Sequence, residues 1–331
     1  MLKRLYEKSR LGFAIAWIVA YCVLLSVGDA LSASLGVEKA VTLPIALLLS
    51  ALLLLFLVRH RLSGAYGLCR PRARARAMLY YLPLLLLLST NLWYGVQPQY
   101  GLAETVLYIL SMLCVGFLEE VIFRGLLFNA MRRENPTAAV AVSSITFGMG
   151  HILNLVNGSG AELLQSLLQV VYATAAGFLF VMIYVRSESL LVCIFTHGVF
   201  NALSAFSNEA AAGDGMRILF CLLLTLISLA YALCLALPLR RKRTEKTENS
   251  SKINARVMVF ICIAFIMTYT AQFFSTEASG SISAAVLYPL SYVISMPLVF
   301  LVDVIFFKEK VTVNNIIGII LVTASGVLIN L

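Results

Sequence analysis

Long apolar stretches follow one another along almost the whole chain, and this repetition limits the folds that are open to it. About 20 consecutive apolar residues can cross a lipid bilayer as a helix, and in lipid the backbone must satisfy its hydrogen bonds internally. We therefore predict an all-α fold, a polytopic membrane helix bundle. Eleven candidate spans can be read, at 11–30, 41–58, 78–95, 103–130, 136–155, 161–185, 189–206, 216–238, 257–276, 281–305 and 313–330.

The composition excludes the main alternative classes of protein. Of the 331 residues, 61% are hydrophobic and 12% are charged, whereas a soluble domain carries roughly 25% charged residues. The same figures exclude a disordered chain. The seven cysteines lie mostly inside apolar stretches and form no CxxC pair, so we expect neither a disulfide framework nor a thiolate metal site.

The placement of the basic residues predicts an orientation. If Lys3 and Arg4 are cytoplasmic and each stretch crosses once, the arginine-rich loop 59–77 is cytoplasmic too, and only Lys39 and Arg217 fall outside. This bias follows the positive-inside rule. We predict a multi-pass protein of a cell membrane with a cytoplasmic N-terminus. The net charge of +9 then reflects topology, and we expect a lipid bilayer as partner and no nucleic acid.

One polar segment predicts a domain boundary. Residues 240–256, RRKRTEKTENSSKINAR, are highly charged and show no apolar periodicity. We predict a membrane core of eight helices over 1–239, a basic cytoplasmic linker over 240–256, and a tail of about three membrane helices over 257–331.

Few ionisable side chains lie inside the predicted spans, and such residues by default mark function or a tightly paired structural site. Glu120 and Arg124 are four residues apart and can pair on one helix face, while Glu119 points about 100° away from Glu120. The full set of candidates is Glu119, Glu120, Arg124, His151, His197 and Asn201.

Depth in the bilayer connects residues from three separate spans. At about 1.5 Å per helical residue, Glu119 lies roughly 18 Å from the cytoplasmic face. By the same rule His151 lies roughly 22 Å and His197 roughly 14 Å from that face. The sequence thus predicts that all three converge on one buried, wet cavity.

These groups suit hydrolysis of an amide bond. A carboxylate and an imidazole can together act as a general base on water, and a second histidine with an amide donor can stabilise the oxyanion. Glu119, His151 and His197 would also supply the two histidines and one carboxylate of a catalytic zinc site, although no HExxH helix is present. The sequence leaves both zinc and no cofactor open.

Three motifs together resemble one known family. Glu119-Glu120-x-x-x-Arg124, Phe147-x-x-x-His151 and His197-x-x-x-Asn201 are similar to the signature of the CPBP family, which contains CAAX prenyl proteases and bacteriocin-processing enzymes, also called Abi proteins. The resemblance covers roughly 80–206. It implies that Glu119 and His151 activate water, that His197 and Asn201 form the oxyanion site, and that Glu120 and Arg124 support them.

The resemblance also implies an activity. Members of the family are intramembrane endopeptidases, described both as metalloproteases and as glutamate-dependent hydrolases. For this chain it implies a peptide or membrane-protein substrate in a bacterial membrane, in peptide processing, bacteriocin self-immunity or protein turnover. The substrate and its cleavage site are not encoded in any pattern that we can read.

The tail resembles a different family. Ala284–Leu290, Phe306–Lys310 and the helix from Gly318 to Gly326 are similar to the closing helices of a drug/metabolite transporter repeat. A non-catalytic membrane protein or a transporter of that type is therefore the alternative function. Three helices are too few for a transporter half, which favours the protease.

Overall fold

The computed structural model describes residues 2–155, 163–208 and 213–244. Its helical elements are α1 (Leu2–Lys8), α2 (Arg10–Leu35), α3 (Thr42–Arg59), η1 (Ala75–Tyr81), α4 (Leu82–Ser89), η2 (Thr90–Leu92), α5 (Leu102–Glu119), η3 (Glu120–Phe128), α6 (Asn129–Met131), α7 (Pro136–Gly150), η4 (His151–Leu155), α8 (Leu163–Ser187), α9 (Leu191–Leu203), η5 (Ser204–Phe206) and α10 (Asp214–Thr244). The predicted tail over 257–331, and the linker beyond 244, lie outside the described residues.

Within the described ranges, seven helices are long and apolar enough to cross a membrane. This agrees with the predicted helix bundle but corrects the predicted number of full-length spans in the core. The exception is the seventh predicted span, 189–206, whose helix Leu191–Phe206 is shorter. At about 1.5 Å per residue it extends about 24 Å, less than the roughly 30 Å of a hydrocarbon core.

Local sequence signals explain where several helices begin and end. The Ser9 side chain caps α2 by accepting a hydrogen bond from the Gly12 N–H, and Asn135 caps α7 in the same way ahead of Pro136. These are typical N-cap and first-turn residues. Gly36 ends α2 with φ of 68°, a left-handed conformation that glycine adopts without a Cβ penalty.

The third predicted span, 78–95, is less regular than expected. Leu79, Tyr80 and Tyr81 all have positive φ values, and a regular helix begins only at Leu82. Pro83 lies in the first turn of this helix, where its missing N–H removes no intrahelical hydrogen bond. The candidate span in the structure is Ala75–Leu92, three residues earlier than predicted, and it contains these irregular residues.

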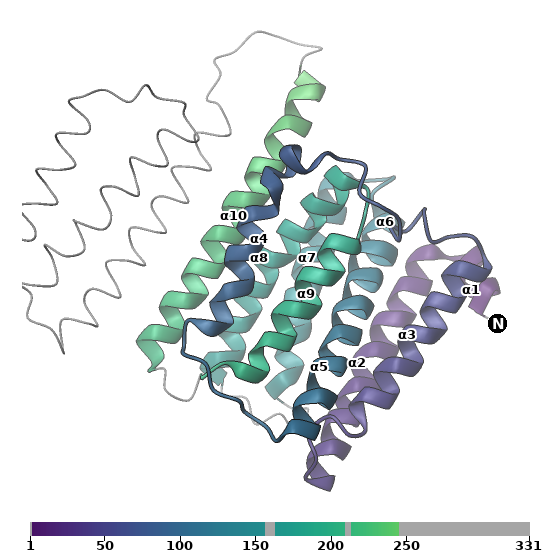
Figure 1. The fold of residues 1–331 in the computed structure, drawn as a ribbon. Coiled ribbons are helices and arrows are strands. Elements are labelled where there is room, and N and C mark those ends of the chain that lie inside the picture. Colours follow the sequence, from purple (N-terminus) through teal and green to yellow (C-terminus); the bar gives the residue numbers. More distant parts are fainter. Residues whose placement is uncertain (1, 156–162, 209–212, 245–331) are drawn as a thin grey trace, which may run out of the picture. The chain divides into compact units, whose positions relative to one another are not determined.

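Figure 1 shows the helices running side by side as a bundle, with α5 next to α9 and α8 next to α10. Small residues permit the closest approaches. A Cβ on Gly116 of α5 would lie 2.5 Å from the Gly198 nitrogen of α9, and a Cβ on Gly177 of α8 would lie 2.9 Å from Cα of Ser144 in α7. Glycine at these positions lets neighbouring backbones touch.

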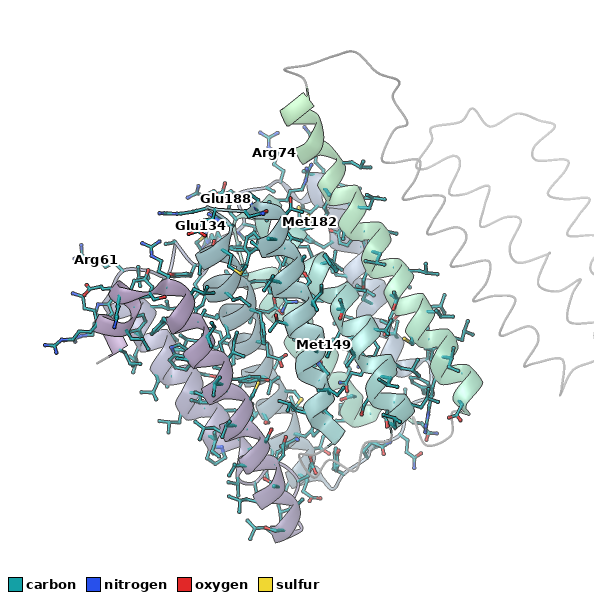
Figure 2. All side chains as sticks on the ribbon, turned by 180° about the vertical axis from the view of Figure 1, so that it is seen from behind. Arg61, Arg74, Glu134, Met149, Met182 and Glu188 are labelled. Carbon is teal, nitrogen blue, oxygen red and sulfur yellow. The ribbon has the colours of Figure 1, made fainter. Side chains whose placement is uncertain are left out.

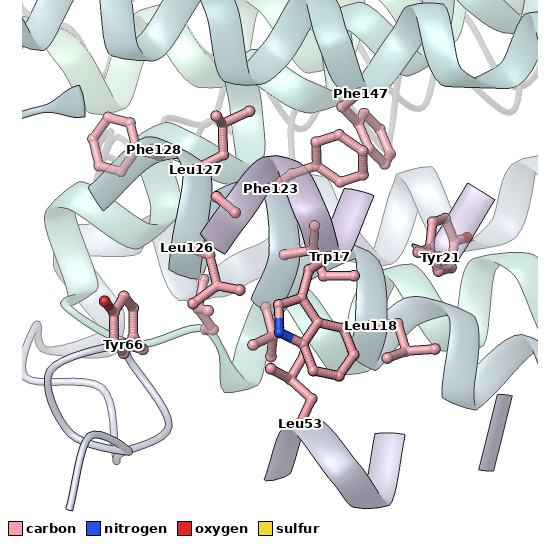
Figure 3. Close-up of a cluster of buried hydrophobic side chains, with 14 of the residues drawn as sticks. Trp17, Tyr21, Leu53, Tyr66, Leu118, Phe123, Leu126, Leu127, Phe128 and Phe147 are labelled. Atoms are coloured by element: carbon pink, nitrogen blue, oxygen red, sulfur yellow. The ribbon is translucent and has the colours of Figure 1, made fainter. Parts of the chain in front are cut away.

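The buried core gathers side chains from α2, α3, α5, η3 and α8. Figure 3 shows aromatic rings of this cluster, with Phe123 beside Phe147 and Trp17 near Leu53. The centroids of the Phe123 and Phe147 rings are 5.5 Å apart in an edge-to-face arrangement, which is a favoured geometry for aromatic pairs. This packing fixes η3 against α7, directly beside the polar residues of the candidate site.

The two ends of the bundle differ in charge. Arg61 and Arg74 mark one end, together with Glu134 and Glu188 (Figure 2). Contacts between segments hold this end together: Arg72 pairs with Glu188 at 2.7 Å. We call it the basic end, and the end that carries Lys39 the opposite end.

Candidate active site

Glu120, at the first position of the π-helical segment η3, is the centre of a buried polar cluster. Its Oε1 atom accepts a hydrogen bond from Arg124 Nη1 at 3.0 Å and lies 2.8 Å from His197 Nδ1. The side chains of Glu120 and Arg124 are fully inaccessible to solvent. The pairing that the four-residue spacing predicts is therefore present, and Glu120 in addition holds the imidazole of His197.

Aromatic rings enclose the Arg124 guanidinium. Its central carbon lies 4.0 Å from the centroid of the Phe147 ring and 5.5 Å from that of Phe180. The electron-rich face of an aromatic ring attracts a cation, and both rings exclude water from the ion pair. Phe147, the first residue of the Phe147-x-x-x-His151 motif, therefore packs on the charged cluster as well as preceding the histidine.

His197 bridges the two glutamates. With Glu120 as acceptor, Nδ1 carries the proton and donates it, and Nε2 faces Glu119 Oε2 at 3.3 Å. The contact between Nε2 and Glu119 Oε2 is not a hydrogen bond. Glu119 Oε2 has no hydrogen-bond partner among the described residues. A buried carboxylate oxygen without a partner is costly unless water or a ligand completes it.

A tyrosine from α2 binds the other oxygen of Glu119. The Tyr21 hydroxyl donates to Glu119 Oε1 at 2.6 Å. Sequence reasoning did not select Tyr21, which lies outside all three motifs. The available signal was a phenol at the middle of a span, away from the interfacial belts where membrane tyrosines usually lie.

A cavity of about 540 Å³ lies next to this cluster and includes three of the predicted residues, Glu119, His151 and Asn201, with Tyr21 in its wall. The His151 Nδ1 atom lies 3.1 Å from the Phe147 carbonyl oxygen, so the backbone of its own helix orients the ring. His197 is not part of the wall; it lies directly behind Glu119 and is 5% exposed.

A zinc ion would need several donor side chains that converge on one point. In the part of the chain that the structure describes, no three His, Cys, Asp or Glu side chains come together in a way that could hold a metal ion. His197 also directs both ring nitrogens at glutamates. The residues as placed do not fit a zinc site of two histidines and one carboxylate, and we derive no step through a metal.

The arrangement as a whole can support acid–base chemistry. Of the predicted site residues, the cavity wall contains the carboxyl group of Glu119, the imidazole of His151 and the amide of Asn201. Tyr21 holds Glu119 in position and Glu120 holds the second imidazole, that of His197. Groups held in this way perform general acid–base catalysis with little reorganisation.

Comparisons with known proteins agree with the motifs. Residues 101–203 match the family model described as "Type II CAAX prenyl endopeptidase Rce1-like". The chain is also 34% identical over 100 residues to the Bacillus subtilis (strain 168) protein named "Putative membrane peptidase YdiL". That alignment covers 30% of this chain and 36% of the relative, so it spans about a third of the relative's length. No solved structure matches the chain.

Proposed function

Residues 101–203 belong to the Rce1-like type II CAAX prenyl endopeptidase (CPBP) family, and from this premise we propose that the chain is an intramembrane endopeptidase that hydrolyses a peptide bond within or near the bilayer. The observation that carries the proposal is the buried cluster in which His197 contacts both Glu119 and Glu120. Glu119 also belongs to the wall of a cavity, and Tyr21 donates a hydrogen bond to its Oε1 atom.

In the proposed reaction, Glu119 and His151 hold a water molecule in the cavity and remove a proton from it as it attacks the peptide carbonyl. Both side chains belong to the cavity wall, which supports this role. The carbon–nitrogen bond then breaks, and the proton held by the pair passes to the departing amine, so that the base is regenerated.

The developing oxyanion needs donors. We assign this role to His197 and Asn201, which are four residues apart on α9 and therefore share a face. With Nδ1 donating to Glu120, this role requires a second proton on Nε2, the ring nitrogen that lies 3.3 Å from Glu119 Oε2. The Asn201 side chain lies in the cavity wall. Preorganised donors of this kind lower the barrier because they do not reorient during the reaction.

Glu120 and Arg124 act in this proposal as positioning residues. Their ion pair is buried, and the Glu120 contact to Nδ1 fixes the orientation of the His197 ring. A carboxylate that orients a catalytic histidine serves a comparable purpose in other hydrolases.

The test is cleavage of a peptide library by purified full-length protein, read by mass spectrometry. Glu119→Gln keeps the shape of the side chain but removes the base, and we expect cleavage to fall by about 10²- to 10⁴-fold with the thermal stability unchanged. Glu134→Gln, an exposed position on the basic end, is the matched control and should cleave like the wild type.

Two outcomes would refute the protease. Cleavage that persists in Glu119→Gln would show that the activity does not come from this site. Ligand transport that survives Glu119→Gln, from a protein that cleaves nothing, would favour the transporter alternative. The metal content of the same wild-type sample, measured alongside, decides between a zinc enzyme and one that works without a cofactor.

A further inference from the structure

We propose that the candidate active site takes its substrate from the non-cytoplasmic face of the membrane, and that the substrate is an extended peptide segment presented on that side. The claim that a substrate enters from this side rests on the proposed function. Its structural content, a cavity that extends from Glu119 toward the opposite end of the described helices, stands independently of catalysis.

The first step is the orientation of the bundle. Among the described side chains, all Lys and Arg residues lie at the basic end except three: the fully buried Arg124, and Lys39 and Arg217 at the opposite end. Short loops rich in Lys and Arg remain in the cytoplasm. The basic end is therefore the cytoplasmic end, which places Lys39 outside.

The second step is the direction of the cavity. From Glu119 its wall continues to Gln99 and Ser207, in the loops at the opposite end, and to Lys39 after α2. The backbone contact Gln97 N–H to Phe206 carbonyl, at 2.9 Å, holds two of these loops together around it. The path from the catalytic carboxylate thus leads away from the basic end.

The third step is the absence of a comparable path on the cytoplasmic side of Glu119. Every residue of η3, from Glu120 to Phe128, is buried, and apart from Gly125 each is at most 3% exposed. A second cavity near the basic end contains Phe128, Arg132 and Arg133 but shares no wall residue with the first. The described core therefore separates the site from the cytoplasmic end with close-packed side chains.

The chemistry of the wall indicates the kind of substrate. Charged groups near the mouth are paired: Lys39 Nζ lies 2.8 Å from Asp29 Oδ1 and 3.4 Å from Glu38 Oε1. Much of the remaining polar surface consists of amide and hydroxyl groups, such as those of Asn91 and Gln99. The amide nitrogens of Asn91 and Gln99 already donate to the Phe200 and Ser207 carbonyls, so these side chains offer their oxygens as acceptors. Acceptors of this kind suit the N–H groups of an extended peptide backbone better than a strongly charged ligand.

The test uses a membrane-impermeant cationic thiol reagent, MTSET, on intact cells that express the full chain. Native cysteines provide the probes: Cys22 lies in the cavity wall next to Tyr21, and Cys69 lies in the arginine-rich loop at the basic end. Gln99→Cys adds a position at the mouth. Modification of each cysteine is read by mass spectrometry in the wild type, and by loss of the free thiol in variants that retain one cysteine.

We expect loss of the free thiol at Cys22 and Gln99→Cys in intact cells, and at Cys69 only after the membrane is permeabilised. Modification of Cys69 in intact cells would overturn the orientation. Modification of Cys22 only after permeabilisation, or under neither condition, would overturn the proposed path. The labelling needs no hydrolysis, so it is repeated in Glu119→Gln; an unchanged pattern there, with no cleavage by the wild type, would refute the protease and leave the path intact.

Discussion

The contact between Gly116 and Gly198 offers a sharp test of how the site is assembled. A Cβ at Gly116 would lie 2.5 Å from the Gly198 nitrogen and 2.6 Å from its Cα. Since non-bonded carbons sit at about 3.5–4.0 Å, Gly116→Ala must separate α5 from α9 by about 1 Å. The obstacle is backbone, so no side-chain rotation can relieve it.

The separation acts directly on the candidate site, because Glu120 follows α5 and His197 belongs to α9. Their 2.8 Å contact would lengthen to about 3.8 Å, beyond the range of a hydrogen bond. A displacement of this size costs about 10²-fold in rate. Overpacking costs about 1–3 kcal/mol of stability, and the higher helix propensity of alanine offsets about 1 kcal/mol of it.

The assay combines thermal unfolding in detergent with peptide cleavage. Gly125→Ala is the matched control on the same continuous helix, because its Cβ would meet its nearest neighbour at an ordinary 3.5 Å. Gly198→Ala, with a nearest contact of 3.2 Å, should fall between the two. Wild-type stability and cleavage in Gly116→Ala would refute the view that this glycine contact sets the geometry of the site.

Three further substitutions test single contacts. Tyr21→Phe removes the donor to Glu119, and we expect kcat to fall by about tenfold or more with KM unchanged, as follows from a charged hydrogen bond; unchanged cleavage would assign Tyr21 to packing alone. Arg124→Met leaves the Glu120 carboxylate buried without its partner and should cost about 3–5 kcal/mol, visible as loss of folded protein, whereas joint Arg124→Met and Glu120→Gln should recover part of it. Burial lowers the pKa of Lys39, but its carboxylate neighbours Asp29 and Glu38 raise it above the ordinary 10.5. The contribution of the charged side chain to the stability of the fold is therefore fully present below pH 10.5 and is lost as the pH rises through the raised pKa. Lys39→Met should therefore lower stability by about 1–2 kcal/mol, equally at pH 6 and pH 9, and a strong pH dependence in that range would contradict the assignment.

The sequence predicted much of this arrangement, and the reasons are physical. Apolar length defines membrane helices, and the cost of charge in lipid makes Glu119, His151 and His197 conspicuous. Their depth could be counted from the helix ends because the helical rise is nearly constant. The Glu120 and Arg124 pair followed from helical spacing alone.

The remaining features depend on how helices contact one another, which periodicity does not encode. An α-helix would direct Glu119 and Glu120 about 100° apart, yet both face one imidazole, because His197 presents two nitrogens on different sides of its ring. The chain also changes from α to π geometry at Glu120, a change often found at functional sites. Tyr21 comes from a helix far away in the sequence, so only the folded structure brings it to Glu119.

The buried Arg124 has a consequence for how the protein is made. The translocon-measured cost of an arginine or an acidic residue at the middle of a membrane helix is about 2.5–3.5 kcal/mol, and the helix from Leu102 to Met131 carries three such groups near its centre. Its partners Phe147, Phe180 and His197 are all synthesised later. The nascent helix therefore enters lipid with its internal Glu120–Arg124 pair and with Tyr21 of α2 already made, and its full set of contacts depends on segments that the ribosome has not yet delivered.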